Sequence, residues 1–373
     1  MVRETSALEP LWPSWDTLAV DARTPFGAPA WALAWWRHLA PDDASLAVVT
    51  VHAGDDLIGL APFYSSRRLG VTELRLLSGG LASRIGIVAA PGREREVAKA
   101  MVQALASADP TPNIVRWEAV DAASPWPEWM SEDWPGGRDH HLRNEVERSA
   151  PLLRLSQGSY EEWLAGKSRN FRSQMRRKRR ALEEKGAIFR HADHSSLERD
   201  LDAFARLHFA RWEGRGGSRA VDEGTMAMLE EAGESLAGAG RFRLWMIDGP
   251  DGETISAQVF VAAGGEVAYW NGGFDERWGE HSPGVVAILA AIEDAFERGD
   301  DLMDLGGGEA GYKERLADED RPVAWRTSYM RGPRYPLARL RRLPEQVARQ
   351  GSRRLRERLG PDRLNRLRGL LSR

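Results

Sequence analysis

The residues best suited to chemistry lie between positions 265 and 316. There a predicted strand is followed by a polar loop, by Ser282-Pro283-Gly284 and by apolar residues at helical spacing. A helix start carries unpaired amides and the positive end of the helix dipole, so it favours a phosphate or another anion. A second strand, residues 301–305, then opens into Gly306-Gly307-Gly308, where bare backbone can approach a ligand closely. We therefore expect a ligand site here.

Other chemistries find little support in the sequence. The chain has no cysteine, which excludes thiol nucleophiles, thiolate metal sites and disulfides and is compatible with the cytosol. No Gly-x-Ser-x-Gly elbow of a serine hydrolase is present. His191 and His194 lack the His-Glu-x-x-His frame of a zinc protease, and the glycine cluster lacks the Lys-Ser/Thr pair of a P-loop. We therefore expect no metal site.

The elements that must position the site indicate an α+β fold with mixed sheets. Strands are expected at residues 46–52, 57–64, 72–77, 84–89, 113–120, 241–248, 253–263 and 301–305. Helices are expected at residues 30–39, 93–106, 167–185 and 197–212, and after Pro283. The hairpins at 46–64 and 241–263 share one pattern, which predicts two similar halves built by duplication. Residues 122–148, rich in proline, glycine and charge, are expected to form a linker-like loop.

Positive charge is concentrated in two segments. The helix expected at 167–185 carries basic residues on most of its surface, which is compatible with a solvated face and with contact to phosphates of a nucleotide or RNA. Residues 331–373 contain fourteen arginines against three acidic residues, although the whole chain has a net charge of only -3. Leucines recur there at helical spacing. We expect short basic amphipathic helices that pack on the body, anchor to anionic lipid or bind RNA.

Five motifs occur in an order that resembles a known family. They are RNFRSQMRRKRRALEEKG, LHFARWEGRGGS, GGFDERW, SPG and DLGGGEAGYK, and together they cover about residues 169–313. The series resembles the GNAT-like acyltransferases first named for cellulose biosynthesis, the CelD-like proteins, which are related to Fem-type peptidoglycan aminoacyltransferases. The first half fits the same family more loosely, through residues 26–36 and 57–62.

The resemblance implies a tandem GNAT-like (acyl-CoA N-acyltransferase) fold of two domains and transfer of an acyl group to an amine or hydroxyl. We expect a degenerate N-terminal GNAT-like domain at residues 1–148 and an acyltransferase domain at 149–332. A basic amphipathic tail is expected at 333–373. A non-catalytic GNAT-fold binding module is the competing class, because duplicated folds often keep a degenerate copy.

The sequence departs from ordinary GNAT enzymes at the donor site. Those enzymes hold the pyrophosphate of coenzyme A with a Gln/Arg-x-x-Gly-x-Gly/Ala loop at a helix start. Here residues 280–285 read EHSPGV, with one glycine. We expect an acyl-CoA or acetyl-CoA co-substrate as the donor, with an aminoacyl-tRNA, as in a Fem-like transferase, or another activated acyl donor as the open alternative.

Direct acyl transfer needs alignment, a base and donors for the developing oxyanion. Glu309 is the first candidate for the base, followed by Asp304 and His208. Asp304 is also compatible with capping local amides, and His208 with a core position. Tyr269 and Tyr312 are candidate proton donors to the leaving group.

A further set of residues is expected to bind the donor or the acceptor. Its members are Arg211, Trp212, Asp275, Ser282, Pro283, Gly284, Gly306 and Lys313. Asp275 is compatible with a role in fixing its own loop.

The expected acceptor is a small molecule, a peptide or a component related to polysaccharide or the cell envelope. We interpret the chain as a bacterial-type GNAT-like acyltransferase, and we expect it in the cytoplasm because its N-terminus lacks the apolar core of a signal peptide. Association with the periphery of the inner membrane through the basic tail is a second expectation, and tRNA binding is a third.

Overall fold

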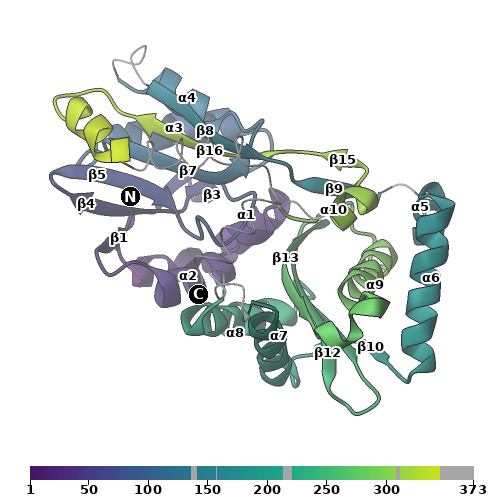
Figure 1. The fold of residues 1–373 in the computed structure, drawn as a ribbon. Helices are drawn as coiled ribbons and strands as arrows, with labels where there is room; N and C mark the ends of the chain where they lie inside the picture. Colours follow the sequence, from purple (N-terminus) through teal and green to yellow (C-terminus); the bar gives the residue numbers. More distant parts are fainter. Residues whose placement is uncertain (136–140, 157, 213–220, 308–310, 345–373) are drawn as a thin grey trace.

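The computed structural model describes residues 1–135, 141–156, 158–212, 221–307 and 311–344 (Figure 1). Its strands form a six-stranded sheet in the order β1-β4-β5-β7-β16-β8, a seven-stranded sheet in the order β10-β11-β12-β13-β14-β9-β15, and a small sheet, β2-β3-β6. The strands are β1 Ala44–Leu46, β2 Val49–Ala53, β3 Asp56–Ala61, β4 Phe63–Arg68, β5 Val71–Leu76, β6 Val88–Ala89, β7 Ile114–Asp121, β8 His141–Arg148, β9 Pro151–Arg154, β10 Ile188–His191, β11 Phe242–Asp248, β12 Thr254–Ala263, β13 Glu266–Phe274, β14 Leu302–Asp304, β15 Glu319–Asp320 and β16 Val323–Tyr329.

Helices cover both faces of the second sheet, with α7 and α8 on one side and α9 and α6 on the other (Figure 1). The helices are α1 Trp12–Asp21, α2 Pro29–Leu39, α3 Glu94–Ala106, α4 Trp126–Asp133, α5 Tyr160–Gly166, α6 Arg169–Glu184, α7 Leu197–Trp212, α8 Glu223–Ala237, α9 Pro283–Glu297 and α10 Gly311–Leu316. Short 3-10 helices include η3 Pro25–Gly27 and η5 Glu276–His281.

The two large sheets share one connection pattern. In the first, β4 pairs antiparallel with β5, and α3 then leads to β7, which pairs parallel with β5. In the second, β12 pairs antiparallel with β13, and α9 leads to β14, which pairs parallel with β13. This repetition confirms the predicted α+β fold with mixed sheets and two similar halves.

Three local predictions were wrong. Residues 122–148 are not only a loop, because α4 and β8 both form there. The single strand predicted at 57–64 is divided into β3 and β4, which lie in different sheets. Only Val88 and Ala89 of the strand predicted at 84–89 pair in a sheet. Sheet membership depends on partners distant in sequence, which a local pattern does not contain.

The chain crosses between the two sheets at two neighbouring points. β8 belongs to the first sheet and β9 to the second, whereas β15 belongs to the second and β16 to the first. Arg84 joins both crossings, because its guanidinium donates to the carbonyl oxygens of Ala150 and Arg321. β16, the last strand among the described residues, lies between β7 and β8 and therefore belongs to the first sheet. The domain boundaries at 148 and 332 stay predictions.

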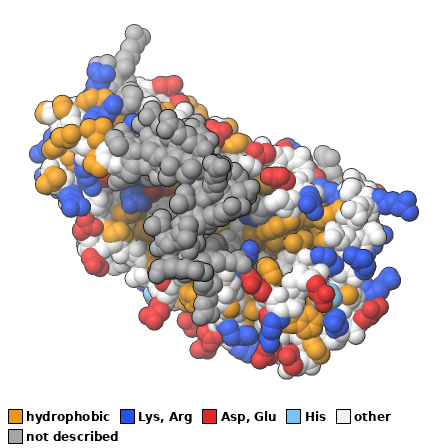
Figure 2. Space-filling model, viewed as in Figure 1, with side chains coloured by type: hydrophobic (Ala, Val, Ile, Leu, Met, Phe, Trp, Pro, Cys, Tyr) orange, Lys and Arg blue, Asp and Glu red, His pale blue; other side chains and the backbone are white. Residues whose placement is uncertain are grey.

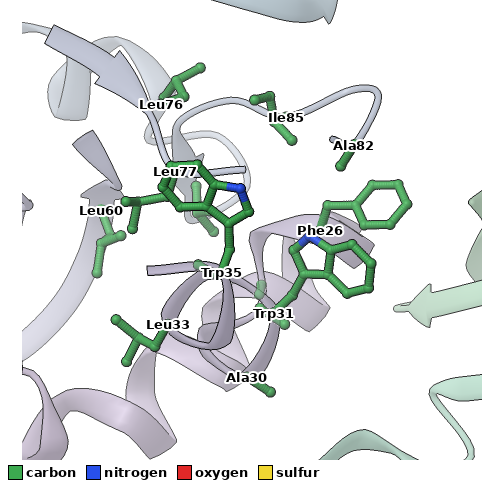
Figure 3. Packing of buried hydrophobic residues seen from close by; sticks show 14 of the residues in the cluster. Phe26, Ala30, Trp31, Leu33, Trp35, Leu60, Leu76, Leu77, Ala82 and Ile85 are labelled. Carbon is green, nitrogen blue, oxygen red and sulfur yellow. The ribbon is translucent and has the colours of Figure 1, made fainter. Parts of the chain in front are cut away.

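A shared aromatic core holds the halves together. Figure 3 shows the part of this core that the first half contributes. Trp31 on α2 is fully buried, and its ring centroid lies 4.9 Å from that of Phe26 and 6.1 Å from that of Trp270 on β13. Trp270 also donates through its indole nitrogen to Leu81 O at 3.0 Å. Burial of large rings is a major source of stability, so this core fixes β13 against the first half.

The first part of the predicted tail packs on the first sheet. Residues 335–344 are helical, and Ala338 and Arg342 on this segment are buried. Ala338 packs with Val71, Ile114 and Tyr329. The rest of the predicted tail, residues 345–373, lies outside the described residues. Among the residues that are described, no helix is both long enough and apolar enough to span a bilayer.

Candidate active site between the two halves

The site begins where β13 and β14 stop pairing. Their parallel ladder runs from Glu266 opposite Leu302 to Ala268 opposite Asp304. β14 ends there, while β13 continues to Phe274. Gly306 follows with a φ of 72°, a left-handed conformation that glycine adopts without strain. The chain therefore turns away from β13 and leaves room between the two strands for side chains and a ligand.

Tyr269 and Gln258 form a buried polar pair beside this opening. The Tyr269 hydroxyl donates to Gln258 Oε1 at 3.0 Å, and Gln258 Nε2 donates to Gly273 O at 3.1 Å. A Cβ on Gly272 would lie 1.8 Å from Gln258 Oε1, so only glycine leaves space for this amide. Burial, with the neighbouring Tyr312 as a second cause, raises the pKa of Tyr269 well above its usual value. Tyr269 therefore keeps its proton at neutral pH, and its hydroxyl can donate a hydrogen bond.

Lys313 is a buried cation at the same place. Its ammonium donates to Gly306 O at 3.2 Å and lies 5.3 Å from the centroid of the Tyr269 ring. Burial lowers the pKa of Lys313 to about 8, although the charge of Asp304 acts in the opposite direction. A lysine of this kind is largely charged at pH 7 and poorly solvated, so it can stabilise a developing negative charge. Burial also raises the pKa of Tyr312.

A hollow of about 170 Å³ adjoins these groups between the two halves. The second half contributes Tyr269, Trp270, Gly306, Gly307 and Lys313 to its lining. The first sheet and the segments around it contribute aromatic and polar side chains that include Phe26, Ser83, Arg148 and, from β16, Trp325. The guanidinium carbon of Arg148 lies 4.9 Å from the centroid of the Trp325 ring, a cation–π contact on the wall. The arrangement combines an apolar wall with a few convergent polar groups, as ligand sites do.

Asp304 lies beneath this site with both carboxylate oxygens engaged. Oδ1 accepts from the Gly306 amide at 2.7 Å, and Oδ2 accepts from Arg84 Nε at 2.6 Å. The Arg84 side chain is only 8% exposed and also pairs with Asp121. This geometry favours the capping interpretation of Asp304 over the role of base, because a base needs a lone pair directed at the substrate.

His208 lies on the other face of β13, away from Tyr269 and Lys313. It is 2% exposed on α7, and its ring packs against Phe204 in the shared core. A Cβ on Gly273 would lie 2.8 Å from the backbone nitrogen of His208, so α7 contacts the strand closely. Burial, assisted by the charge of Arg211, lowers the pKa of His208, and the imidazole is therefore neutral at pH 7. The core interpretation fits this position.

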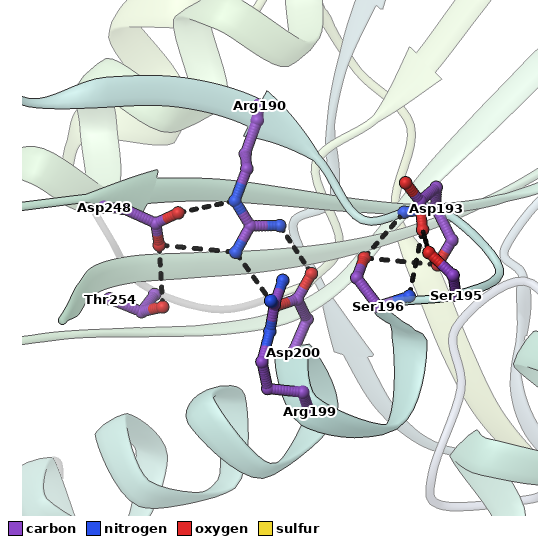
Figure 4. A network of polar contacts seen from close by, with 8 residues as sticks. All are labelled: Arg190, Asp193, Ser195, Ser196, Arg199, Asp200, Asp248 and Thr254. Carbon is purple, nitrogen blue, oxygen red and sulfur yellow. Dashed lines mark hydrogen bonds and ion pairs between the residues drawn. The ribbon is translucent and has the colours of Figure 1, made fainter. Parts of the chain in front are cut away.

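An ion-pair network fixes the start of α7 to the sheet (Figure 4). Arg190 on β10 donates to both oxygens of Asp200 on α7, at 2.5 and 2.9 Å, and also pairs with Asp248 at the end of β11. Asp248 in turn accepts from the Thr254 hydroxyl at 2.8 Å. Because α7 is held in this way, Arg211 at its other end has a defined position.

Arg211 reaches the end of β13, and its guanidinium carbon lies 5.2 Å from the centroid of the Phe274 ring. The side chain of Trp212 is outside the described residues. Asp275 caps η5, since Oδ1 accepts from the Arg277 amide at 2.9 Å and Oδ2 from Arg277 Nε at 2.8 Å. These contacts fit the interpretation that Asp275 fixes its own loop.

The predicted helix start at Ser282-Pro283-Gly284 is the start of α9. Ser282 has a φ of 48° and makes no side-chain cap bond, but its hydroxyl accepts from Lys178 Nζ on α6 at 2.5 Å. Pro283 has no N–H, and the amides of Val285 and Val286 both donate to Ser282 O. This helix start therefore offers fewer amides to a phosphate than a glycine-rich loop does, and Lys178 adds a cation.

Two candidates from the sequence remain without a structural account. Glu309 lies outside the described residues, as does the side chain of Trp212, so the role of Glu309 as base and that of Trp212 in binding stay predictions. The structure adds Gln258, Lys178 and Arg84 to the surroundings of the site. Gln258 has a sequence signal, because it is the one amide side chain in β12, where the other residues are apolar or carry a small hydroxyl. Arg84 has none.

The fold is a tandem GNAT-like fold, and a family model for a GNAT-type acetyltransferase domain matches the part of the chain that holds most of the site residues. Residues 169–314 match the family model described as an acetyltransferase (GNAT) domain. No curated protein sequence matches the chain significantly.

Solved structures share this fold at low sequence identity. FemX superimposes with a TM-score of 0.64 at 12% identity, over 88% of this chain and 97% of that one. The C-terminal domain of a putative lysylphosphatidylglycerol synthetase from Agrobacterium fabrum gives 0.56 at 10% identity, over 88% and 93%. L-PGS from Bacillus licheniformis gives 0.51 at 9% identity, over 90% and 96%. At such low sequence identities, the structural similarity shows a shared fold alone.

Proposed function

We propose that this chain is an acyltransferase that moves an acyl group from an activated carbonyl donor to an amine or hydroxyl. The observation that carries the proposal is a buried lysine with a pKa of about 8 beside two phenols, within the matched GNAT domain. Lys313 and Tyr269 line the hollow between the halves. Their chemistry suits a reaction in which a carbonyl oxygen becomes negatively charged.

In the proposed step, the acceptor nitrogen or oxygen forms a bond to the acyl carbon, and the carbon–sulfur or ester carbon–oxygen bond of the donor breaks. The acceptor loses a proton to a base, for which Glu309 stays the prediction. The leaving thiolate or alkoxide takes a proton from Tyr269 or Tyr312. The Lys313 ammonium stabilises the oxyanion of the tetrahedral intermediate, a contribution worth several kcal/mol in a water-poor site.

We propose a CoA thioester as the first donor to test. The start of α9 with the neighbouring Lys178 suits a phosphate. The small number of amides at this helix start supports an aminoacyl-tRNA as the second donor. The likeness in fold to FemX and to a putative lysylphosphatidylglycerol synthetase supports the same alternative and a cell-envelope acceptor such as a lipid or peptide.

The test incubates the full chain with a panel of amines and alcohols and with either acyl-CoA thioesters or charged tRNA, and detects acylated product by mass spectrometry. Product from thioesters that survives nuclease treatment supports the first donor, whereas product that nuclease abolishes supports the second. The Glu309→Gln variant should reduce turnover by about 10² because it removes the predicted base and keeps its size. The absence of product with every pair would favour a binding module.

A further inference from the structure

One end of the first half exposes an unusual group of leucines. Leu69 at the tip of the β4–β5 hairpin is 76% exposed, and Leu337, Leu340 and Leu343 on the helical segment 335–344 are 39%, 61% and 46% exposed. The two segments are neighbours, because Arg341 donates to Val71 O at 3.1 Å and a Cβ on Gly70 would lie 3.9 Å from Arg334 Nε. The leucines therefore belong to one surface.

The fold of the chain does not explain why residue 69 is a leucine. The hairpin pairs Arg68 with Val71, so Leu69 and Gly70 form a two-residue turn, with φ angles of 53° and 73°. A turn with two left-handed residues favours Asn-Gly, and a bulky apolar residue is strained at its first position. Leu69 thus gains neither burial nor a favourable backbone conformation in the isolated chain. A contact outside the chain would account for it.

Arginines surround these leucines. Arg67 and Arg68 flank the hairpin tip and are exposed, as are Arg331 and Arg334 before the helical segment. The adjoining hollow is lined by Arg67, Arg331 and Arg334 against one acidic residue, Asp109. Figure 2 shows orange and blue side chains together at this end of the molecule, over the yellow helical segment of Figure 1. We call these four leucines and four arginines the leucine–arginine face.

The chain continues from this face with the same composition. Residues 345–373 contain nine arginines and three acidic residues, with leucines at helical spacing. Exposed apolar side chains flanked by arginines match a lipid surface with anionic headgroups, because leucines enter the interface while arginines contact phosphates. An RNA partner would leave the leucines without a role.

We propose that the leucine–arginine face docks on an anionic membrane surface, with the hairpin tip and the helical segment 335–344 inserting together. This inference extends the tail anchor predicted from sequence to a structured part of the first half. It does not depend on the proposed acyl transfer, because vesicle binding is measured without substrate.

The experiment uses the full chain and sedimentation with vesicles of phosphatidylglycerol and phosphatidylcholine or of phosphatidylcholine alone. Wild type should bind the mixed vesicles and bind phosphatidylcholine weakly, and salt should weaken the binding. Leu69→Asn should weaken binding to the mixed vesicles at least fivefold. Its melting temperature should be unchanged or higher, since Asn suits the turn. Ile188→Asn is the matched control, because Ile188 is 61% exposed but lies on β10 of the other sheet.

Several results would overturn the proposal. Equal binding of wild type and Leu69→Asn to anionic vesicles would assign any membrane contact to residues 345–373 alone. A similar loss of vesicle binding in Ile188→Asn would mean that any exposed apolar residue contributes to binding, wherever it lies on the surface. In a third outcome, wild type does not bind vesicles but self-associates or binds tRNA, and Leu69→Asn abolishes that interaction. The leucine–arginine face would then be an interface for a second copy or for RNA.

Discussion

Asp304 and Lys313 are both buried charged side chains near the hollow, yet their surroundings give them different roles. Asp304 binds the guanidinium of Arg84 and the amide of Gly306, so its charge is satisfied within the protein. Lys313 donates to carbonyl oxygens of the glycine segment, and burial lowers its pKa to about 8. Strongly shifted lysines in a cleft are typical of functional sites, whereas a paired carboxylate is typical of structure.

Replacing Asp304 should therefore affect stability before chemistry. Asp304→Asn keeps the side-chain volume but leaves the 8% exposed Arg84 with one carboxylate partner fewer. We expect a loss of about 3 kcal/mol in the free energy of unfolding, the low end for a broken buried pair, because Asp121 still pairs with Arg84. Chemical denaturation measures this loss.

Asp318→Asn is the control for that experiment, since its carboxylate is 32% exposed and pairs with Lys167 near the surface. It should cost less than about 1 kcal/mol. Full stability of Asp304→Asn together with a loss of turnover of about 10² would show that Asp304 is the base after all.

At the scale of elements, the start of α9 is the feature on which donor binding depends. Gly284→Glu adds bulk and negative charge at a place proposed to hold a phosphate. Donor affinity should fall at least tenfold, measured by titration calorimetry with the donor that gives product. Gly284→Ala is the matched control, because its uncharged Cβ would be tight only against Phe274 Cδ1, at 3.2 Å, with Gln258 Nε2 at an ordinary contact distance of 3.6 Å. Unchanged affinity in Gly284→Glu would move the donor site elsewhere.

The elements of this region could largely be predicted from the sequence, because their signals are local. The apolar stripe of α9, its Ser-Pro-Gly start and the strands β11, β12 and β14 all follow from periodicity and turn residues. The partner of Asp304 could not be predicted, since Arg84 is 220 residues away along the chain. The position of His208 depends on the face of β13 that is covered by α7. A stripe of apolar residues along a helix does not specify the sheet on which the helix packs.

At the scale of the whole molecule, the two crossings between the sheets place charged groups in a buried junction. Glu266 at the start of β13 belongs to it, and burial raises the pKa of this carboxyl to about 7, opposed by Arg321 and increased by Asp304. The ordinary value is 4.5. A carboxyl with a raised folded pKa stabilises the fold when protonated, and this contribution is lost as pH rises from about 4.5 to about 7.

Glu266→Gln should therefore remove a pH dependence. Relative to wild type, the variant should gain up to about 3 kcal/mol in the free energy of unfolding at pH 8, and little at pH 4. Urea denaturation across this pH range measures the difference. Parallel curves for the two proteins would show that Glu266 titrates normally in the folded chain.

The measurement that tests the central claim most directly is the ratio of wild-type to Lys313→Met acyl transfer between about pH 6 and pH 10. Taking a ratio cancels the titration of the acceptor itself. If the Lys313 ammonium stabilises the oxyanion, the ratio should be about 10² at pH 6 and fall towards 1 as pH rises through about 8. A ratio near 1 at every pH, or one that increases above pH 8, would contradict the account.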